Sequence, residues 1–251
     1  MPNRLAPFAA LLMAFAWTIA AAHAGTTGPY ANWAAIVVAG DHEDSDGAPS
    51  EGFDNARREV SRDLLKLGFL RGNIAQFSLR PREYASERLL KTSPNAILRA
   101  LGKLVRKASG GCLLYFSSHG EPDGLILGDW VVTPHALAQV VDHTCADRPT
   151  VVIISACFSG AMVPALKGPN RLILTAARRD RTSFGCGQSD RYPYFDQCVL
   201  QSWGGASSFS DLAGRARACV SAREKAERLK PASEPQYWVG PQALASLPRW
   251  H

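Results

Sequence analysis

GCLLYFSSHG, residues 111–120, is an apolar run that stops at two serines, a histidine and a glycine. The apolar residues 112–116 are typical of a strand that is buried on both faces of a parallel sheet. A turn would by itself account for the Ser-Ser-His-Gly that follows. The alternative is a strand that presents His119 at its carboxyl end, which is where functional sites lie in parallel sheets. The rest of the chain decides between these two interpretations.

Similar apolar runs recur along the chain and alternate with helical patterns. Short continuous runs predict further strands at 33–40, 73–79, 150–157 and 171–177. Apolar residues at steps of three and four predict helices at 54–68, 93–105, 133–141 and 209–220, and residues 124–134 resemble a small hairpin. This alternation predicts a three-layer α-β-α sandwich around a mostly parallel sheet. The proline-containing tail after Leu229 is expected to be an extended wrap.

The amino-terminal segment has the pattern of a secretory signal. Arg4 precedes a long apolar stretch, and Ala22-His23-Ala24 supplies the small residues that flank a cleavage point before Gly25. We therefore expect a signal peptide at 1–24 and one domain at 25–251, with its core at about 33–230. The alternative is an uncleaved membrane anchor. After cleavage we expect no stable membrane insertion, and either a periplasmic or a secreted location.

Composition agrees with one soluble globular domain. The 251 residues are 46% hydrophobic and 20% charged, which suits one globular core. The formal charge of +6 is modest and spread along the chain, so we expect no nucleic-acid partner. The sequence does not indicate an oligomeric state.

Cysteine spacing bears on metal binding and on disulfides. The chain has six cysteines and no Cys-x-x-Cys pair, so we expect neither a metal site nor a cofactor. Cys112 lies within an apolar run and is interpreted as a small buried hydrophobic residue. Two disulfides could form among the remaining four cysteines, and three pairings are possible: these residues are Cys145, Cys186, Cys198 and Cys219. Cys157 is then the odd thiol, which is unusual in an exported protein.

His119 and Cys157 end two successive core strands of the predicted sheet. An imidazole beside a thiol can take its proton and so form the nucleophilic thiolate. Gly120 offers an unshielded amide that could donate to an oxyanion, and the amide of Cys157 is the natural second donor. The joint occurrence favours a catalytic dyad over a turn and an inert thiol.

These motifs resemble a known family. LLYFSSHG (113–120) and VVIISACFSG (151–160) are similar to the His-Gly and Ala-Cys signatures of caspase-like, clan CD cysteine peptidases. Within that clan they are most similar to the legumain type, the asparaginyl endopeptidases and GPI-anchor transamidases. The family block TAANPRESSYAC is similar to TAARRDRTSFGC (175–186). The first strand of the family is similar to AIVVAG (35–40).

The resemblance implies roles for individual residues. The general base falls on His119 and the nucleophile on Cys157, with oxyanion donors at Gly120 and Cys157. A serine that lines the specificity pocket falls on Ser183, and a pocket aspartate on Asp196. The implied reaction is hydrolysis of peptide or protein substrates through an acyl-enzyme.

The sequence also departs from the family pattern. An Arg-His pair that helps to bind asparagine is replaced by Gly52 and Phe53, and the acidic residue after the nucleophile is replaced by Phe158. Asparaginyl specificity is therefore not expected, and Asp196 without an arginine partner could favour a basic P1 residue. Two other functions stay open: transamidation by the same dyad, and a non-catalytic envelope protein that binds ligands with this fold.

Overall fold

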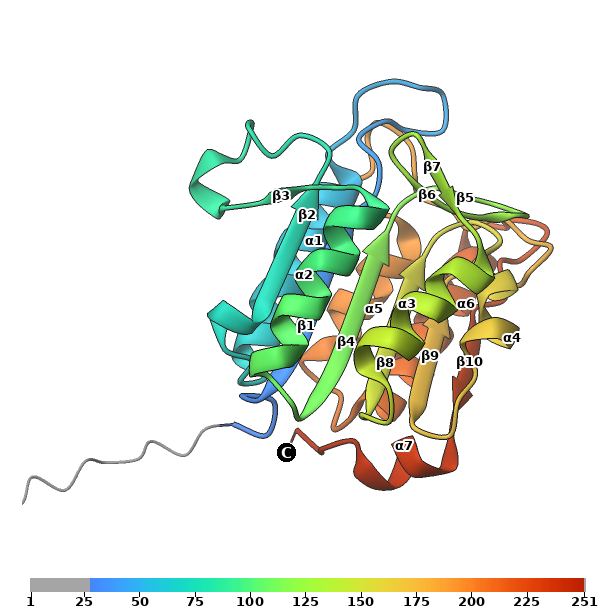
Figure 1. Ribbon diagram of the computed structural model, residues 1–251. Coiled ribbons are helices and arrows are strands. Elements are labelled where there is room, and N and C mark those ends of the chain that lie inside the picture. The colour runs from blue at the N-terminus through green and yellow to red at the C-terminus, as the bar shows by residue number, and fades with distance from the viewer. Residues whose placement is uncertain (1–27, 251) are drawn as a thin grey trace, which may run out of the picture.

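The computed structural model describes residues 28–250, so the expected signal peptide lies outside the described residues. Within them, seven strands form one sheet in the order β10-β9-β8-β4-β1-β2-β3 (Figure 1). Neighbouring strands are parallel except β10, which is antiparallel to β9. The strands of this sheet are β1 (Trp33–Ala39), β2 (Ile74–Ser78), β3 (Leu90–Lys91), β4 (Gly111–Ser117), β8 (Thr150–Ser155), β9 (Arg171–Thr175) and β10 (Gln236–Val239).

Helices cover both faces of the sheet, as the α-β-α prediction requires. One face carries α1 (Gly52–Lys66), α5 (Tyr194–Trp203) and α6 (Phe209–Ala226), and the other carries α2 (Pro94–Lys107), α3 (Pro134–Cys145) and α4 (Val163–Leu166). The remaining elements are α7 (Pro241–Ser246), the short 3₁₀ helices Arg71–Asn73, Ala85–Glu87 and Ser159–Met162, and the small antiparallel sheet β5 (Gly120–Glu121), β6 (Gly124–Leu127) and β7 (Trp130–Val132).

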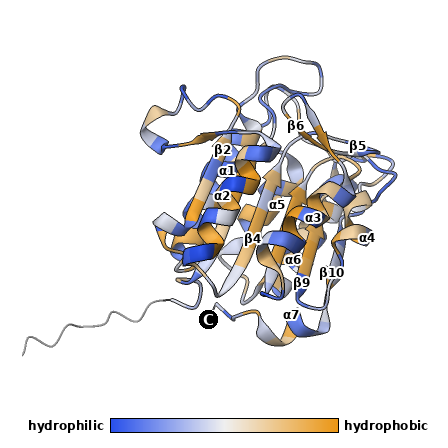
Figure 2. Cartoon of the chain, viewed as in Figure 1, coloured by the Kyte–Doolittle hydropathy of each residue, from blue (hydrophilic) through white to orange (hydrophobic). Residues whose placement is uncertain are grey.

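The central strands are apolar because each strand packs against helices on both of its faces. In β1 the side chains of Ala35 and Val37 enter the core beneath α1, α5 and α6, and those of Ile36 and Val38 enter the core beneath α2 and α3. Successive side chains of a strand point to opposite faces, so no position along β1 is left for a polar residue. Figure 2 shows the result, with apolar strands between helices whose polar residues face outward.

Local sequence signals set the helix starts. The hydroxyl of Ser93 accepts a hydrogen bond from the amide of Ala96, and Pro94 occupies the first turn of α2. Thr133 caps α3 in the same way. These two starts agree with the sequence prediction, and together the helices hold β4 and β8 at the centre of the sheet.

The disulfides correct part of the cysteine prediction. Cys112 is not a free hydrophobic residue but is bonded to Cys145, which joins β4 to the end of α3. Cys198 is bonded to Cys219, which joins α5 to α6. Cys186 is a free thiol, and so is Cys157.

Two segments differ from the sequence prediction. Residues 194–203, for which the sequence predicts no element, form helix α5. The tail is not merely extended, because it contributes the edge strand β10 and helix α7. Trp250 then stacks on Trp203, with ring centroids 5.6 Å apart, and so fixes the end of the chain to the helical layer.

Candidate active site

His119 leaves the sheet two residues after the end of β4 and is half-buried. Its Nε2 atom lies 3.0 Å from the backbone oxygen of Glu43. Because a carbonyl oxygen only accepts, this contact places the proton of a neutral ring on Nε2 and leaves the lone pair on Nδ1. The ring of Phe53 packs edge-to-face against the imidazole, with centroids 4.9 Å apart. His119 is therefore oriented by two contacts, and Nδ1 is the nitrogen that can accept a proton.

Cys157 leaves the sheet two residues after the end of β8 and is also half-buried. The amide of Ser183 donates to its Sγ at 3.2 Å, and the Ser183 hydroxyl lies 3.5 Å from the same atom. The thiol can in turn donate to the backbone oxygen of Ser183, 3.8 Å away. The sulfur is thus held beside Ser183, and it is not part of a disulfide.

The backbone brings the ends of β4 and β8 together. The two strands are parallel neighbours, and Ser117 pairs with Ser155, so His119 and Cys157 emerge at the same level of the sheet. A Cβ atom built on Gly120 would lie 2.2 Å from the backbone oxygen of Cys157. Only glycine permits this approach, which explains the residue that follows the histidine.

The chain turns sharply directly after the nucleophile. Phe158 adopts the left-handed conformation, with φ of 56°, and its amide donates to the backbone oxygen of Arg181. A non-glycine residue in that region costs about 1 kcal/mol or more, so the turn is held by its surroundings. Among residues 28–250, no group accepts a hydrogen bond from the amide of Cys157. That amide can therefore serve a ligand.

Asp196 lies beneath the site and not in an open pocket. Its side chain is 0% exposed and accepts hydrogen bonds from the hydroxyls of Tyr115, Ser117 at 2.7 Å and Ser155 at 2.8 Å. Burial raises the pKa of this carboxyl to about 6, although the three hydroxyls act in the opposite direction. The residue ties α5 to the ends of β4 and β8.

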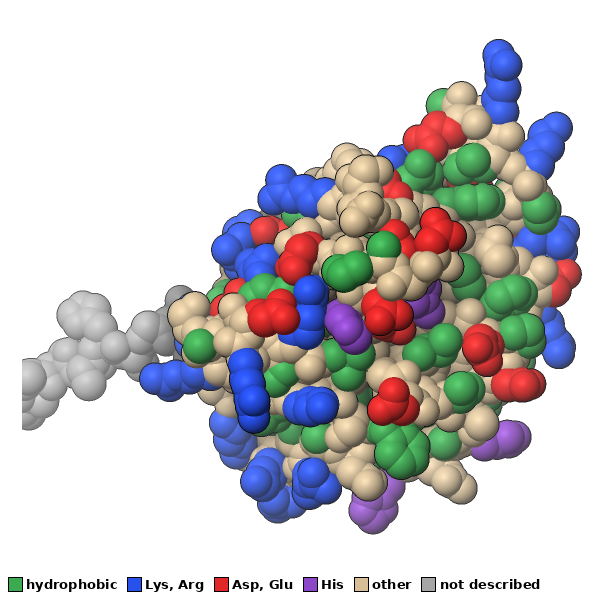
Figure 3. Space-filling view, turned by 90° about the horizontal axis from the view of Figure 1, so that it is seen from above, with side chains coloured by type: hydrophobic (Ala, Val, Ile, Leu, Met, Phe, Trp, Pro, Cys, Tyr) green, Lys and Arg blue, Asp and Glu red, His purple; other side chains and the backbone are tan. Residues whose placement is uncertain are grey.

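Figure 3 views the molecule from above, at the carboxyl ends of the strands. Histidine and acidic side chains gather near the middle of this face, and lysine and arginine side chains stand around its margin. Among the described residues, no group of three histidine, cysteine or acidic side chains could hold a metal ion. The chemistry available at this face is that of a thiol, an imidazole and backbone amides.

Comparison with known proteins assigns the family. Residues 84–219, just over half of the chain, match the peptidase C13 family. The chain belongs to that family. It is a cysteine peptidase of the legumain type, within the caspase-like clan, and such an enzyme acts on peptide or protein substrates.

The fold of this C13 peptidase is that of the caspases. Caspase-1 from Spodoptera frugiperda superimposes with a TM-score of 0.59, at 18% sequence identity, over 85% of this chain and 88% of that chain. At this identity the similarity shows the fold alone. No curated protein sequence matches the chain.

The structure shows where this C13 peptidase departs from the expected pocket. Ser183 lies beside the nucleophile, but Asp196 is enclosed and its carboxylate oxygens are occupied. The basic P1 preference that was inferred from Asp196 therefore loses its structural support. Phe53, which the family resemblance places at one position of an asparagine-binding pair, packs on His119.

Two features of the site were not predicted from the sequence. The Glu43 contact uses a backbone oxygen, which any residue type would supply. Cys186 is free and follows Ser183 by three residues; its burial, with Cys157 nearby, raises the pKa of its thiol. A family block that ends in cysteine could have indicated that Cys186 stays near the nucleophile.

Proposed function

We propose that this C13 peptidase hydrolyses peptide bonds through a dyad of Cys157 and His119. The observation that carries the proposal is the parallel register of β4 and β8, which delivers both residues to one edge of the sheet. Support also comes from the free thiol and from the Glu43 contact, which leaves Nδ1 of His119 unprotonated in the neutral ring.

In the proposed mechanism, Nδ1 of His119 takes the proton of the Cys157 thiol. The thiolate attacks the scissile carbonyl carbon, and the amides of Gly120 and Cys157 donate to the oxyanion of the tetrahedral intermediate. The imidazolium then gives its proton to the leaving amine as the carbon–nitrogen bond breaks. Water, activated by the same imidazole, hydrolyses the thioester and releases the acid product.

Transamidation is the alternative fate of the same acyl-enzyme. If an amine reaches the thioester before water does, a new amide bond forms and the thiol is regenerated. Cleavage of casein in the presence of a high concentration of hydroxylamine would distinguish the two outcomes, because a transamidase would yield hydroxamate products in preference to free acids.

Substitution of the dyad tests the proposal. Cys157→Ala and His119→Ala should each reduce hydrolysis of casein by at least about a thousandfold, because either change removes the activated nucleophile. Both proteins should unfold within a few degrees of the unsubstituted enzyme, since both side chains lie at the surface of the site. Retention of activity in either well-folded variant would refute the dyad, and a chain that binds peptides without cleaving them would support the binding-protein alternative.

We also propose that the enzyme is exported, with a mature chain that begins at Gly25. The basic and apolar amino-terminal segment supports this, and so do the two disulfides, which persist in oxidising compartments. Among the described residues, no helix is long and apolar enough to cross a membrane. The intact mass of the protein purified from its natural host tests the proposal. A full-length chain with six reduced cysteines would contradict it.

A further inference from the structure

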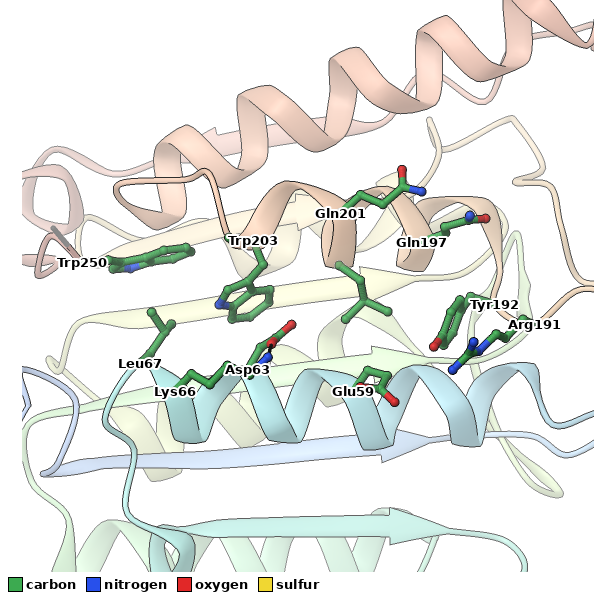
Figure 4. A pocket seen from close by; sticks show the side chains of 12 residues that line it. Glu59, Asp63, Lys66, Leu67, Arg191, Tyr192, Gln197, Gln201, Trp203 and Trp250 are labelled. Atoms are coloured by element: carbon green, nitrogen blue, oxygen red, sulfur yellow. Dashed lines mark hydrogen bonds and ion pairs between the residues drawn. The ribbon is translucent and has the colours of Figure 1, made fainter.

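A groove lies along the helical face between α1 and α5, and neither His119 nor Cys157 is among the residues that line it (Figure 4). Its volume is about 650 Å³, which is within the range of ligand-binding clefts. Leu67, Trp203 and Trp250 lie together at one end of the view, and Arg191 and Tyr192 lie at the other. The groove therefore has an aromatic end and a polar end.

The aromatic end contains a hydrogen-bond donor without an acceptor. Trp203 is 5% exposed, and its indole N–H has no partner among the described residues. The neighbouring Trp250 differs, because its indole N–H donates to the hydroxyl of Tyr30 at 3.0 Å. Buried N–H groups are rarely left unpaired, and this one is enclosed beside the stacked Trp250 ring, so a ligand oxygen can reach the donor when that ring shifts.

The polar end of the groove adjoins the catalytic site. The side chain of Asn55 in α1 donates to the backbone oxygen of Arg191 at 3.2 Å, which holds the 190–193 loop against the first turn of α1. That same turn carries Phe53, whose ring packs on His119. A helix of 15 residues is about 22 Å long, which an extended peptide of about seven residues spans. A substrate that leaves the catalytic site at this loop can thus continue along the groove.

Polar side chains along the two walls of the groove recur at about the spacing of residues in an extended chain. Gln197 and Gln201 are four residues apart on α5, and Glu59 and Asp63 are four residues apart on α1, so each pair is separated by about 6 Å. Groups on the same side of an extended peptide recur at about 6.6 Å. The side-chain oxygen of Gln197 already accepts from Arg223, but among the described residues the side-chain nitrogens of both glutamines have no acceptor and can donate to peptide carbonyl groups.

The carboxylates on α1 are available to a ligand. Glu59 pairs with Arg62, whose side chain is 57% exposed, and Asp63 pairs with Lys66, whose side chain is 76% exposed. Ion pairs with such exposed partners are weak and exchange readily. A peptide with basic or amide side chains can therefore replace those partners.

We infer that this groove is a secondary binding site for an extended segment of the polypeptide substrate. A large apolar side chain of the segment packs at the Trp203–Trp250 pair, and a backbone oxygen of the segment accepts from the Trp203 indole. Polar or basic residues of the segment lie between this anchor and the catalytic site. The inference rests on the proposed peptidase function, since it requires a polypeptide that also reaches Cys157.

Filling the groove tests the inference. Gly204 lines it, has an ordinary helical φ of −65°, and has nothing within 4 Å of a Cβ position, so Gly204→Tyr adds a side chain without backbone strain. Gly214 on α6 is equally unobstructed but does not line the groove, which makes Gly214→Tyr the matched control. The kcat/KM for casein should fall about tenfold in Gly204→Tyr and stay unchanged in Gly214→Tyr.

A short reporter peptide separates this inference from the proposed function. A fluorogenic peptide of three residues, chosen from the sequence at a casein cleavage site, is too short to reach the aromatic end of the groove. Its kcat/KM should be the same in all three proteins. Equal cleavage of casein by Gly204→Tyr and Gly214→Tyr would overturn the secondary site while leaving the peptidase intact. Failure of the unsubstituted enzyme to cleave either substrate would overturn the proposed function and, with it, this inference.

The indole resonance gives a second readout. In Cys157→Ala labelled with ¹⁵N, a 20-residue casein peptide that spans a cleavage site should shift the Trp203 indole resonance downfield, and further than that of Trp250, whose N–H already donates to Tyr30. An unchanged Trp203 resonance at saturating peptide would contradict the assigned contact. A shift produced instead by an oligosaccharide such as chitotriose, without one from the peptide, would make the groove a carbohydrate site and overturn the inference.

Discussion

Gly120 is the position at which a single methyl group should disable the enzyme. A Cβ atom there would lie 2.2 Å from the backbone oxygen of Cys157 and 3.0 Å from the Cβ of Ala156. Since non-bonded contacts of this kind under 3.0 Å are essentially never found, Gly120→Ala must separate the two backbones by about 0.8 Å. Both neighbours belong to the turn that carries the nucleophile, so this separation displaces Cys157 relative to His119.

A displacement of about 1 Å in a catalytic group costs about a hundredfold in rate, or about 2.7 kcal/mol of activation free energy. We therefore expect Gly120→Ala to lower kcat/KM for a reporter peptide about a hundredfold, and to lower the free energy of unfolding by about 1–3 kcal/mol.

The matched control is Gly102→Ala in α2, where the nearest atom to the added Cβ is the flexible end of Arg106 at 3.9 Å. This variant should keep full activity and gain about 0.5–1 kcal/mol of stability, because alanine is the better helix former. Normal kinetics in Gly120→Ala, measured per active site, would refute the close approach on which the site geometry depends.

Two further predictions concern groups around the dyad. The raised pKa of Asp196, about 6 against 3.8, means that the folded protein binds this proton more tightly than the unfolded chain. The resulting stabilisation is complete below about pH 4 and is lost as pH rises through 6, by up to about 3 kcal/mol, and Asp196→Asn should remove that slope from urea unfolding between pH 4 and 7. An identical slope in both proteins would contradict the burial of a titrating carboxyl. Phe53→Leu should lower kcat about two- to tenfold by removing an aromatic contact with His119, and an unchanged kcat per titrated active site would show that the ring does not position the imidazole.

The central sheet was predictable because its strands are apolar on both faces. Residues 151–154 are all apolar, and such a run has few stable places other than the middle of a parallel sheet. Polar residues that end two such strands must meet at one edge, which is why His119 and Cys157 could be singled out from sequence. Their placement followed from topology and needed no knowledge of side-chain packing.

The features that sequence did not reveal depend on the direction of side chains in space. Cys112 resembles its apolar neighbours, and its bond to Cys145 arises only because β4 presents that side chain to the end of α3. Asp196 lies in the first turn of a ten-residue helix, and its burial depends on which side of α5 faces the sheet. Residues 236–239 are too few and too polar at one end to indicate a strand without the edge of β9 beside them.

The pH dependence of cysteine alkylation tests most directly whether the imidazole activates the thiol. Iodoacetamide should label Cys157 well below pH 7 in the unsubstituted enzyme, as read by mass spectrometry, and should leave Cys186 unlabelled because burial raises the pKa of that thiol. In His119→Ala the labelling of Cys157 should shift to the range of an ordinary thiol, near pH 8.5. The same labelling profile with and without the imidazole would contradict the account.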